Sequence, residues 1–247
     1  MDSVWLVTGT AAFGAGVLNA IAGGGSFLTF PALVYAGVPP LAANATSAAA
    51  VSPGYLGSTL GFKAELQAIP GTTLQREVIV AAIGGLIGAA LLLITPARLF
   101  SGLVPWLLLL ATALFALGPV IASRGASLGH PQWRLPGLLL VAIYGGYFNG
   151  GLGILLMALY TLTGESRLNT VNALKNLNSF VLSWLSVAAF AWAGAIVWHQ
   201  ALWMMALATL GGWSGARLAK RLPARWVRGL VIATGLAMSV VFFSRAH

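Results

Sequence analysis

Long stretches without any charged residue dominate this chain and restrict what it can fold into. Only 7% of its 247 residues are charged, whereas soluble globular domains carry roughly 25%. The uncharged stretches cover almost the whole chain, at residues 3–62, 78–97, 99–123, 135–164, 176–216 and 229–244. A soluble fold of this size needs more surface charge, so the pattern predicts a membrane protein.

The two longest stretches have room for more than one membrane crossing each. A helix needs about 20 apolar residues to cross a hydrocarbon core of ~30 Å, and residues 3–62 and 176–216 are far longer than that. Backbone groups in lipid must be satisfied internally, and the stretches lack the alternation of barrel strands. We predict an all-α polytopic membrane protein with about eight transmembrane helices in two related halves, some of them broken at glycines.

Apolar periodicity and turn residues give a first set of helix boundaries. Helices are expected near residues 4–22, 26–36, 41–62, 76–95, 98–122, 136–149, 153–163, 168–193, 197–218 and 225–244.

Two glycine clusters, at residues 22–26 and 149–153, interrupt apolar stretches in corresponding places. Residues 16–19 (Gly-Val-Leu-Asn) precede the first cluster, and residues 146–149 (Gly-Tyr-Phe-Asn) run into the second, 130 positions later. Broken helices at matching positions of two halves are a pointer to a transporter binding site. We predict a first repeat at 1–125, a linker at 126–135 and a second repeat at 136–247. Whether the repeats are inverted or parallel depends on the number of crossings in each.

The net charge of +9 has a topological explanation, because the basic residues flank apolar stretches. It does not predict nucleic-acid binding. The densest basic group is expected in the cytoplasm and consists of Arg217, Lys220, Arg221, Arg225 and Arg228. With an even number of crossings, both termini would then lie outside. The chain has no cysteine, which excludes disulfides and thiolate chemistry.

A polar stripe marks the helix expected at 168–193. Its members recur every three or four residues and therefore share one helical face: Asn169, Asn172, Asn176, Ser179, Ser183 and Ser186. Lys175 adjoins the stripe and is the one charge expected well inside the membrane, where a charge indicates function by default. A lysine that snorkels to the interface is the structural alternative. The first half carries a less regular stripe: Asn44, Thr46, Ser47, Ser52, Tyr55, Ser58 and Thr59.

The expected positions of the acidic residues favour an anionic rather than a cationic ligand. The four acids are expected at helix ends or in loops: Asp2, Glu65, Glu77 and Glu165. Half-helices after the glycine breaks would present N–H groups and the positive ends of their dipoles. The isolated histidines predict no metal site, and no catalytic constellation or cofactor motif is visible. Glycine pairs such as Gly84/Gly88 and Gly211/Gly215 predict close helix packing.

The motifs together resemble the sulfite exporter TauE/SafE family over nearly the whole chain. The first repeat carries the resemblance at residues 16–26, in the turn at 37–40 and at Asn44–Ser47 (Asn-Ala-Thr-Ser). The second carries it at residues 172–176 (Asn-Ala-Leu-Lys-Asn) and 211–217. The resemblance implies a multi-pass permease of the cell membrane, built of two related halves and associated with sulfite, sulfonates and other small organic anions.

We therefore expect a secondary transporter that holds a small anion between its halves in the lipid bilayer, with H+ or Na+ as a possible coupling ion. The predicted substrate-binding residues are Asn19, Gly23, Gly24, Gly25, Ser26, Asn44, Thr46, Ser47, Asn149, Gly150, Gly151, Gly153, Asn172, Lys175 and Asn176. Two alternatives remain, an accessory membrane subunit whose polar stripes only pack helices and an intramembrane enzyme. The oligomeric state is unknown at this level, as is the choice between carrier and channel.

Overall fold

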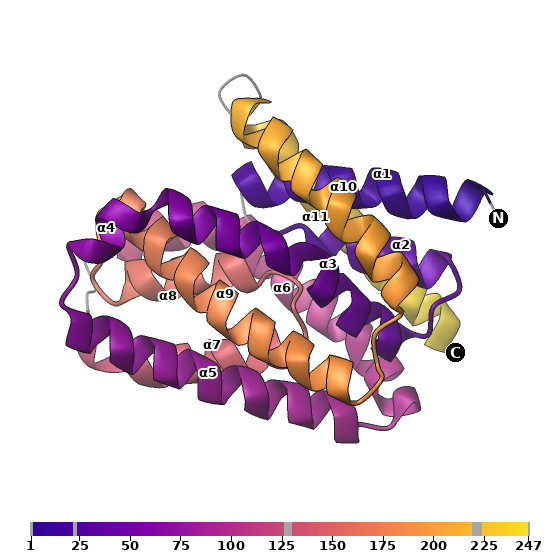
Figure 1. Ribbon diagram of the computed structural model, residues 1–247, viewed down its shortest axis with the longest axis horizontal. Coiled ribbons are helices and arrows are strands. Elements are labelled where there is room, and N and C mark those ends of the chain that lie inside the picture. The colour runs from indigo at the N-terminus through magenta and orange to yellow at the C-terminus, as the bar shows by residue number, and fades with distance from the viewer. Residues whose placement is uncertain (1, 22–23, 126–129, 219–223, 247) are drawn as a thin grey trace.

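The computed structural model describes residues 2–21, 24–125, 130–218 and 224–246, and these residues form helices joined by short turns (Figure 1). In chain order the helices are α1 (Asp2–Ile21), α2 (Ser26–Tyr35), α3 (Pro40–Gly61), α4 (Lys63–Gln67), α5 (Gly71–Ile94), α6 (Ala97–Gly125), the 3-10 helix η1 (Pro131–Trp133), α7 (Arg134–Tyr147), α8 (Leu152–Leu162), α9 (Leu168–Trp192), α10 (Trp198–Leu218) and α11 (Ala224–Ala246). No strand occurs in the described part of the chain, so the all-α prediction is confirmed.

The predicted helix boundaries agree with the structure to within a few residues except at the start of α5. That helix begins at Gly71, five residues before the predicted start at 76, because Pro70 supplies the turn that precedes it. The short α4 and η1 were not expected. The predicted linker at 126–135 contains η1 and the start of α7, while residues 126–129 lie outside the described part, as do Lys220 and Arg221 of the basic group.

Helix length and composition bear on the predicted number of crossings. By both criteria α5 and the part of α6 from Ala97 to Leu114 qualify as membrane spans among the described residues. Apolar segments at Ser3–Asn19, Ser26–Tyr35, Leu152–Leu162 and Ile232–Ser244 are shorter. The glycine breaks explain two of these shorter helices, α2 and α8, because each break divides an apolar stretch. The count of eight crossings stays a prediction.

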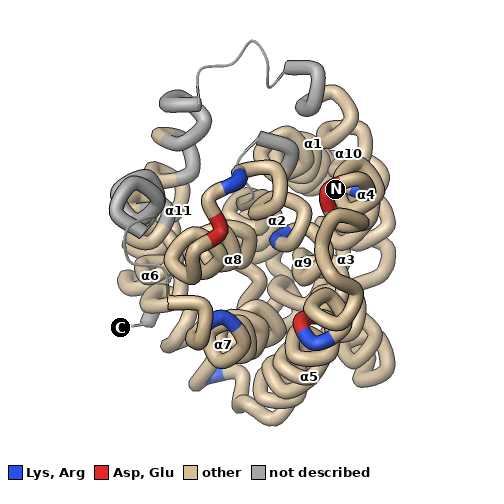
Figure 2. The backbone as a smooth tube through the Cα atoms, turned by 90° about the vertical axis from the view of Figure 1, so that its left-hand side faces the viewer, with Lys and Arg blue, Asp and Glu red and all other residues tan. Residues whose placement is uncertain are grey.

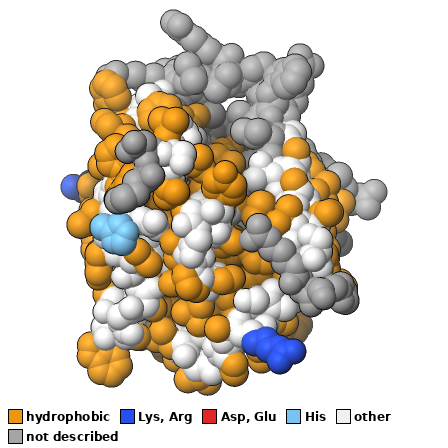
Figure 3. Space-filling model, turned by 90° about the vertical axis from the view of Figure 1, so that its right-hand side faces the viewer, with side chains coloured by type: hydrophobic (Ala, Val, Ile, Leu, Met, Phe, Trp, Pro, Cys, Tyr) orange, Lys and Arg blue, Asp and Glu red, His pale blue; other side chains and the backbone are white. Residues whose placement is uncertain are grey.

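The surface of the molecule is apolar over much of its extent. On α5, large aliphatic side chains such as Ile79, Ile83 and Ile94 are exposed. Figure 3 shows hydrophobic side chains across the described surface of one side, with no acidic side chain visible there. Figure 2, seen from the opposite side, shows how few charged positions interrupt the described backbone. An outward apolar face of this kind suits contact with lipid.

Helices of the two halves pack on one another in matching pairs. When α1, α2, α3, α5 and α6 are matched in order with α7 to α11, the most extensively packed pairs have counterparts. The pair α1–α10 corresponds to α5–α7, and α3–α10 corresponds to α5–α9. In the pairs α3–α9 and α6–α11, a helix packs on its own counterpart from the other half. Figure 1 shows α5 with α7 along one edge and α1 with α10 near the other.

Glycines explain why the tightest pairs can approach so closely. A Cβ atom on Gly16 of α1 would collide with the carbonyl oxygen of Ala208 on α10, and one on Gly146 of α7 with that of Gly85 on α5. Gly16 and Gly146 occupy matching positions in the two repeats, at the start of residues 16–19 and 146–149. The predicted packing role of Gly84 and Gly88 is confirmed, because both meet α7.

The two central helices, α3 and α9, are antiparallel. Thr46, near the start of α3, bonds Val197 just beyond the end of α9, and Ser52 bonds Ser183. The short α4, which follows α3, packs beside the start of α9. Residue numbers therefore rise along α3 while they fall along α9, so matched helices of the two halves point in opposite directions.

Candidate functional site

The break between α1 and α2 is held by the side chain of Asn19. Its Oδ1 accepts hydrogen bonds from the backbone N–H groups of Gly24 (3.0 Å) and Gly25 (2.8 Å). A Cβ on Gly25 would lie 2.7 Å from the carbonyl oxygen of Ala15, so only glycine fits here. Asn19 thus does for α2 what an N-cap side chain does. Its predicted role as a donor to an anion stays a prediction, and Gly23 lies outside the described residues.

The break between α7 and α8 is held by Tyr144. The hydroxyl of Tyr144 donates to the carbonyl oxygen of Gly150 at 2.8 Å. Gly151 adopts a left-handed conformation (φ +77°), which glycine accepts without strain and which turns the chain into α8. Sequence reasoning did not single out Tyr144, because an aromatic residue in an apolar stretch gives no distinct signal.

The two breaks meet at a buried polar cluster, here called the junction. It consists of Ser26, Ser52, Tyr55, Asn149 and Ser183. Ser26 Oγ at the start of α2 donates to Oδ1 of Asn149 at 3.1 Å, and Tyr55 Oη reaches the same oxygen at 3.4 Å. Asn149 Nδ2 donates to Ser183 Oγ (3.3 Å), which also lies 3.1 Å from Ser52 Oγ. Ser26 and Asn149, 123 positions apart in the sequence, are therefore brought together.

The predicted residues of α3 bond to neighbouring segments. Asn44 Nδ2 donates to the carbonyl oxygen of Tyr147 at 2.9 Å, Thr46 Oγ1 accepts from the N–H of Val197 at 3.0 Å, and Ser47 Oγ lies 2.6 Å from Thr29 Oγ1. All three are buried. In this conformation their polar groups join the two halves and anchor α2.

The start of α9 is different, because its predicted polar residues have no partners in the part of the chain that the structure describes. Asn172, Lys175 and Asn176 make no hydrogen bond or ion pair with any described residue, and Ser179 Oγ is buried without a partner. Lys175 is 7% exposed and Asn176 5%. At 100° per residue the four lie within one arc of the helix, here called the α9 polar face.

Within this face, Ser179 Oγ is the polar atom that is both buried and without a partner. Such a group costs about 1–3 kcal/mol. The α9 polar face is therefore a place where a ligand with negative charge would find unsatisfied groups.

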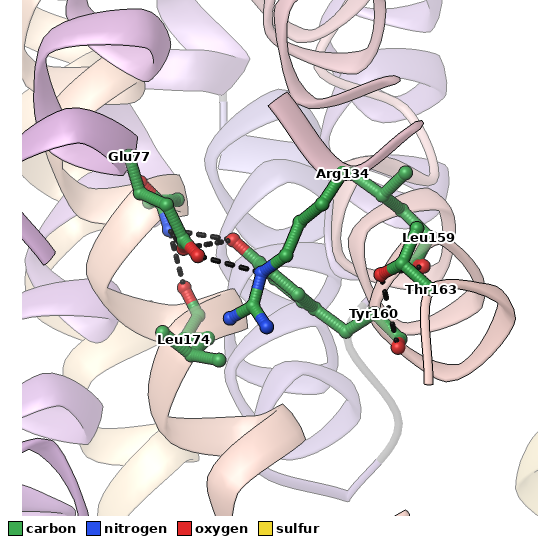
Figure 4. A network of polar contacts seen from close by, with 7 residues as sticks. Glu77, Arg134, Leu159, Tyr160, Thr163 and Leu174 are labelled. Carbon is green, nitrogen blue, oxygen red and sulfur yellow. Dashed lines mark hydrogen bonds and ion pairs between the residues drawn. The ribbon is translucent and has the colours of Figure 1, made fainter. Parts of the chain in front are cut away.

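A buried ion pair lies on another face of α9 (Figure 4). Glu77 of α5 is fully buried, and its Oε1 lies 2.7 Å from Nε of Arg134 on α7. Its Oε2 accepts from Tyr160 Oη (2.8 Å) and from Asn178 Nδ2 (3.1 Å). Arg134 also lies over the ring of Tyr160, 5.0 Å from its centre.

The expectation that Glu77 lies at a helix end or in a loop is wrong. The helix begins five residues earlier than predicted, so Glu77 is its seventh residue and faces the other half of the protein. The Pro70–Gly71 pair could have revealed this, because proline just before a helix start is a recognised signal. Arg134 then neutralises the carboxylate, so the acid offers no free negative charge to a ligand.

An open hollow of about 710 Å³ lies at the start of α9. Its lining comes from α4 and from the segment that enters α9: Ala64, Glu65, Ala68, Ser166, Arg167, Leu168, Asn169 and Thr170. Leu168 and Lys175 are seven residues apart on the same face of α9, which corresponds to ~10 Å along the helix. The hollow thus lies about two helical turns from Lys175 along α9.

The chain matches the family model "Sulfite exporter TauE/SafE" over residues 9–242. It belongs to the TauE/SafE family. This is a family of membrane transporters rather than enzymes, and the match covers both breaks, the junction and the α9 polar face.

Individual TauE/SafE relatives agree with this assignment. "Probable membrane transporter protein ORF9" of Sinorhizobium sp. is 28% identical over 236 residues, 93% of this chain and 88% of the relative. "Probable membrane transporter protein" of Haemophilus influenzae is 28% identical over 231 residues (92% and 89%). "Probable membrane transporter protein YfcA" of Escherichia coli K12 is 25% identical over 244 residues (94% and 87%). No solved structure matches the chain.

Proposed function

We propose that this member of the TauE/SafE family is a secondary transporter that exports a small anion, such as sulfite, an organosulfonate or a related organic anion. The observation that carries the proposal is the buried Lys175, which has no partner among the described residues and lies on the helix whose Ser183 bonds Asn149 of the second break. Among the ionisable side chains described as buried, Glu77 has Arg134 as its counter-ion, so the charge left for a ligand is positive.

The fold supports a mechanism of alternating access between two halves. Residues 1–125 and 136–247 act as inverted repeats, since α3 and α9 are antiparallel and the packed pairs exchange between the halves. The substrate site lies between them, drawn from the predicted residues around the breaks and on α9. A rocking of one repeat on the other around that site is the motion this architecture suits.

We propose the cell membrane as the location of this multi-pass protein. No nucleotide-binding motif is visible in the sequence, so an H+ or Na+ gradient or the membrane potential would supply the energy. The accessory-subunit alternative is retained as an outcome of the test below.

The test is flux of radiolabelled sulfite and taurine in proteoliposomes that contain the purified protein. Saturable flux in the native protein, lost in Lys175→Met, supports an anion carrier. Lys63→Met is the matched control, because Lys63 on α4 is exposed and its loss should leave flux unchanged. Absence of flux for both anions with folded protein would favour the accessory-subunit role, and flux that does not saturate would indicate a channel.

A further inference from the structure

Hydroxyl groups in the helices of this protein usually bond the carbonyl oxygen one turn back, and Ser179 does not. Such bonds to the residue four positions earlier are made by Ser52, Ser58, Ser101, Ser186 and Ser239. Ser179 Oγ is fully buried and has no partner of any kind in the described chain. Its hydroxyl therefore lacks even the hydrogen bond to the carbonyl oxygen four residues earlier that serines within helices commonly make.

The surroundings of Ser179 on α9 are equally unsatisfied. Lys175 lies one turn before it on the same face, and Asn172 and Asn176 complete an arc of about 100°. One turn further along, Ser183 is already bonded to Asn149 and Ser52. The polar groups without partners therefore lie between the hollow and the junction. Lys175 is about two turns from Leu168 in the lining of the hollow, and Ser179 is one turn before Ser183 of the junction.

At the corresponding place in the first half, the polar side chains of α3 have partners. There, Asn44, Thr46 and Ser47 are all bonded, and the next turn of α3 consists of Ala48, Ala49, Ala50 and Val51. At the breaks, the N–H groups of Gly24 and Gly25 are bonded to Asn19. In the part of the chain that the structure describes, α9 therefore carries Lys175, Asn176 and Ser179 buried close together without partners.

We infer that the α9 polar face, with Ser179 as a ligand beside Lys175, is where the protein binds the oxyanion group of its substrate. The inference rests on the proposed function and narrows it, because it moves the site from the N–H groups of the breaks to α9. Lys175 supplies the single positive charge, Ser179 donates its hydroxyl hydrogen, and Asn172 and Asn176 add amide donors. One cation with neutral donors matches a singly charged sulfonate, hydrogen sulfite or carboxylate group.

The hollow beside α4 lies near the start of this face. From Leu168 in its lining, Lys175 is about two helical turns further along α9, and Ser179 is one turn beyond Lys175.

The native absence of cysteine makes a direct test possible. Ser179→Cys is reconstituted in neutral lipid and treated with a sulfonate-bearing methanethiosulfonate reagent, which is both a thiol probe and a mimic of the substrate class. Ser186→Cys is the control, because Ser186 lies on the same helix but is bonded to the carbonyl oxygens of Gly85 and Leu182. We expect the Ser179→Cys variant to react at least about tenfold faster, and ethanesulfonate to slow this reaction.

The role of Lys175 is tested in the same assay. Adding Lys175→Met to Ser179→Cys should reduce labelling by the anionic reagent about tenfold while leaving labelling by neutral methyl methanethiosulfonate unchanged. If Ser179→Cys does not fold, Asn176→Cys takes its place. Equal labelling of the Ser179→Cys and Ser186→Cys variants, or an equal effect of Lys175→Met on both reagents, would overturn the inference.

These outcomes are separable from those of the proposed function. Anion-selective labelling without flux would leave the α9 site in place and reject transport. Saturable flux with a Ser179→Cys variant that neither reagent labels would leave transport in place and reject the α9 site.

Discussion

The carboxylate of Glu77 on α5 lies 2.7 Å from Nε of Arg134 on α7, so a buried ion pair fastens one half of the protein to the other. The side chain of Glu77 is 1% exposed and that of Arg134 21%. Tyr160 of α8 and Asn178 of α9 complete the hydrogen bonds of the carboxylate. Four helices therefore depend on one acidic residue.

Glu77→Ala should lower the free energy of unfolding by about 3 kcal/mol, because it leaves the guanidinium of Arg134 and the donors of Tyr160 and Asn178 without their acceptor. Thermal unfolding in detergent, followed by tryptophan fluorescence, measures the effect. The double variant Glu77→Ala/Arg134→Ala should lose less than the sum of the two single changes. Strict additivity would show that the pair contributes no coupling.

Asn19→Ala should destabilise the protein by about 1 kcal/mol, because the N–H groups of Gly24 and Gly25 lose their shared acceptor. Asn19→Asp keeps an oxygen in the same place and should restore most of the stability. The same unfolding assay compares the two variants. Equal losses in both would argue against the capping role.

Gly88→Val should destabilise the protein by about 1–3 kcal/mol or more, because a side chain there collides with the carbonyl oxygen of Ile143 and separates α5 from α7. Gly102→Val in α6 is the matched control, since a Cβ at that position meets nothing within 4 Å. Both changes replace glycine by valine within a helix, so they alter the helix propensity equally. A difference between the unfolding midpoints of the two variants therefore measures the effect on packing. Similar midpoints would contradict the close approach of the two helices.

Lys175→Met should leave the unfolding midpoint unchanged or raise it, although the same change should abolish anion flux. The Lys175 side chain is buried and has no counter-ion among the described residues, so its replacement by an apolar side chain of similar length removes a desolvation cost. Unfolding of the Lys175→Met and Lys63→Met variants is compared in detergent. A marked loss of stability in Lys175→Met alone would assign the lysine a structural role.

The amino-acid sequence determined the local features of this protein. Uncharged stretches predicted the helices, and glycine clusters predicted the two breaks, because both depend on residue type and near neighbours. The matched Gly16 and Gly146 were visible from spacing alone, and so was the polar stripe of α9. Lys175 was also identifiable from the sequence, because a charge expected inside the membrane is energetically costly and indicates function.

Tertiary structure decided which polar groups are satisfied. Nothing in the sequence distinguishes Asn44, which bonds the carbonyl oxygen of Tyr147, from Asn172, which bonds no described residue. Glu77 is buried because α5 packs on α7 and brings Arg134, 57 positions away, to its carboxylate. Hydrogen bonds and ion pairs act over about 3 Å, and only the packing of distant helices brings such partners within reach.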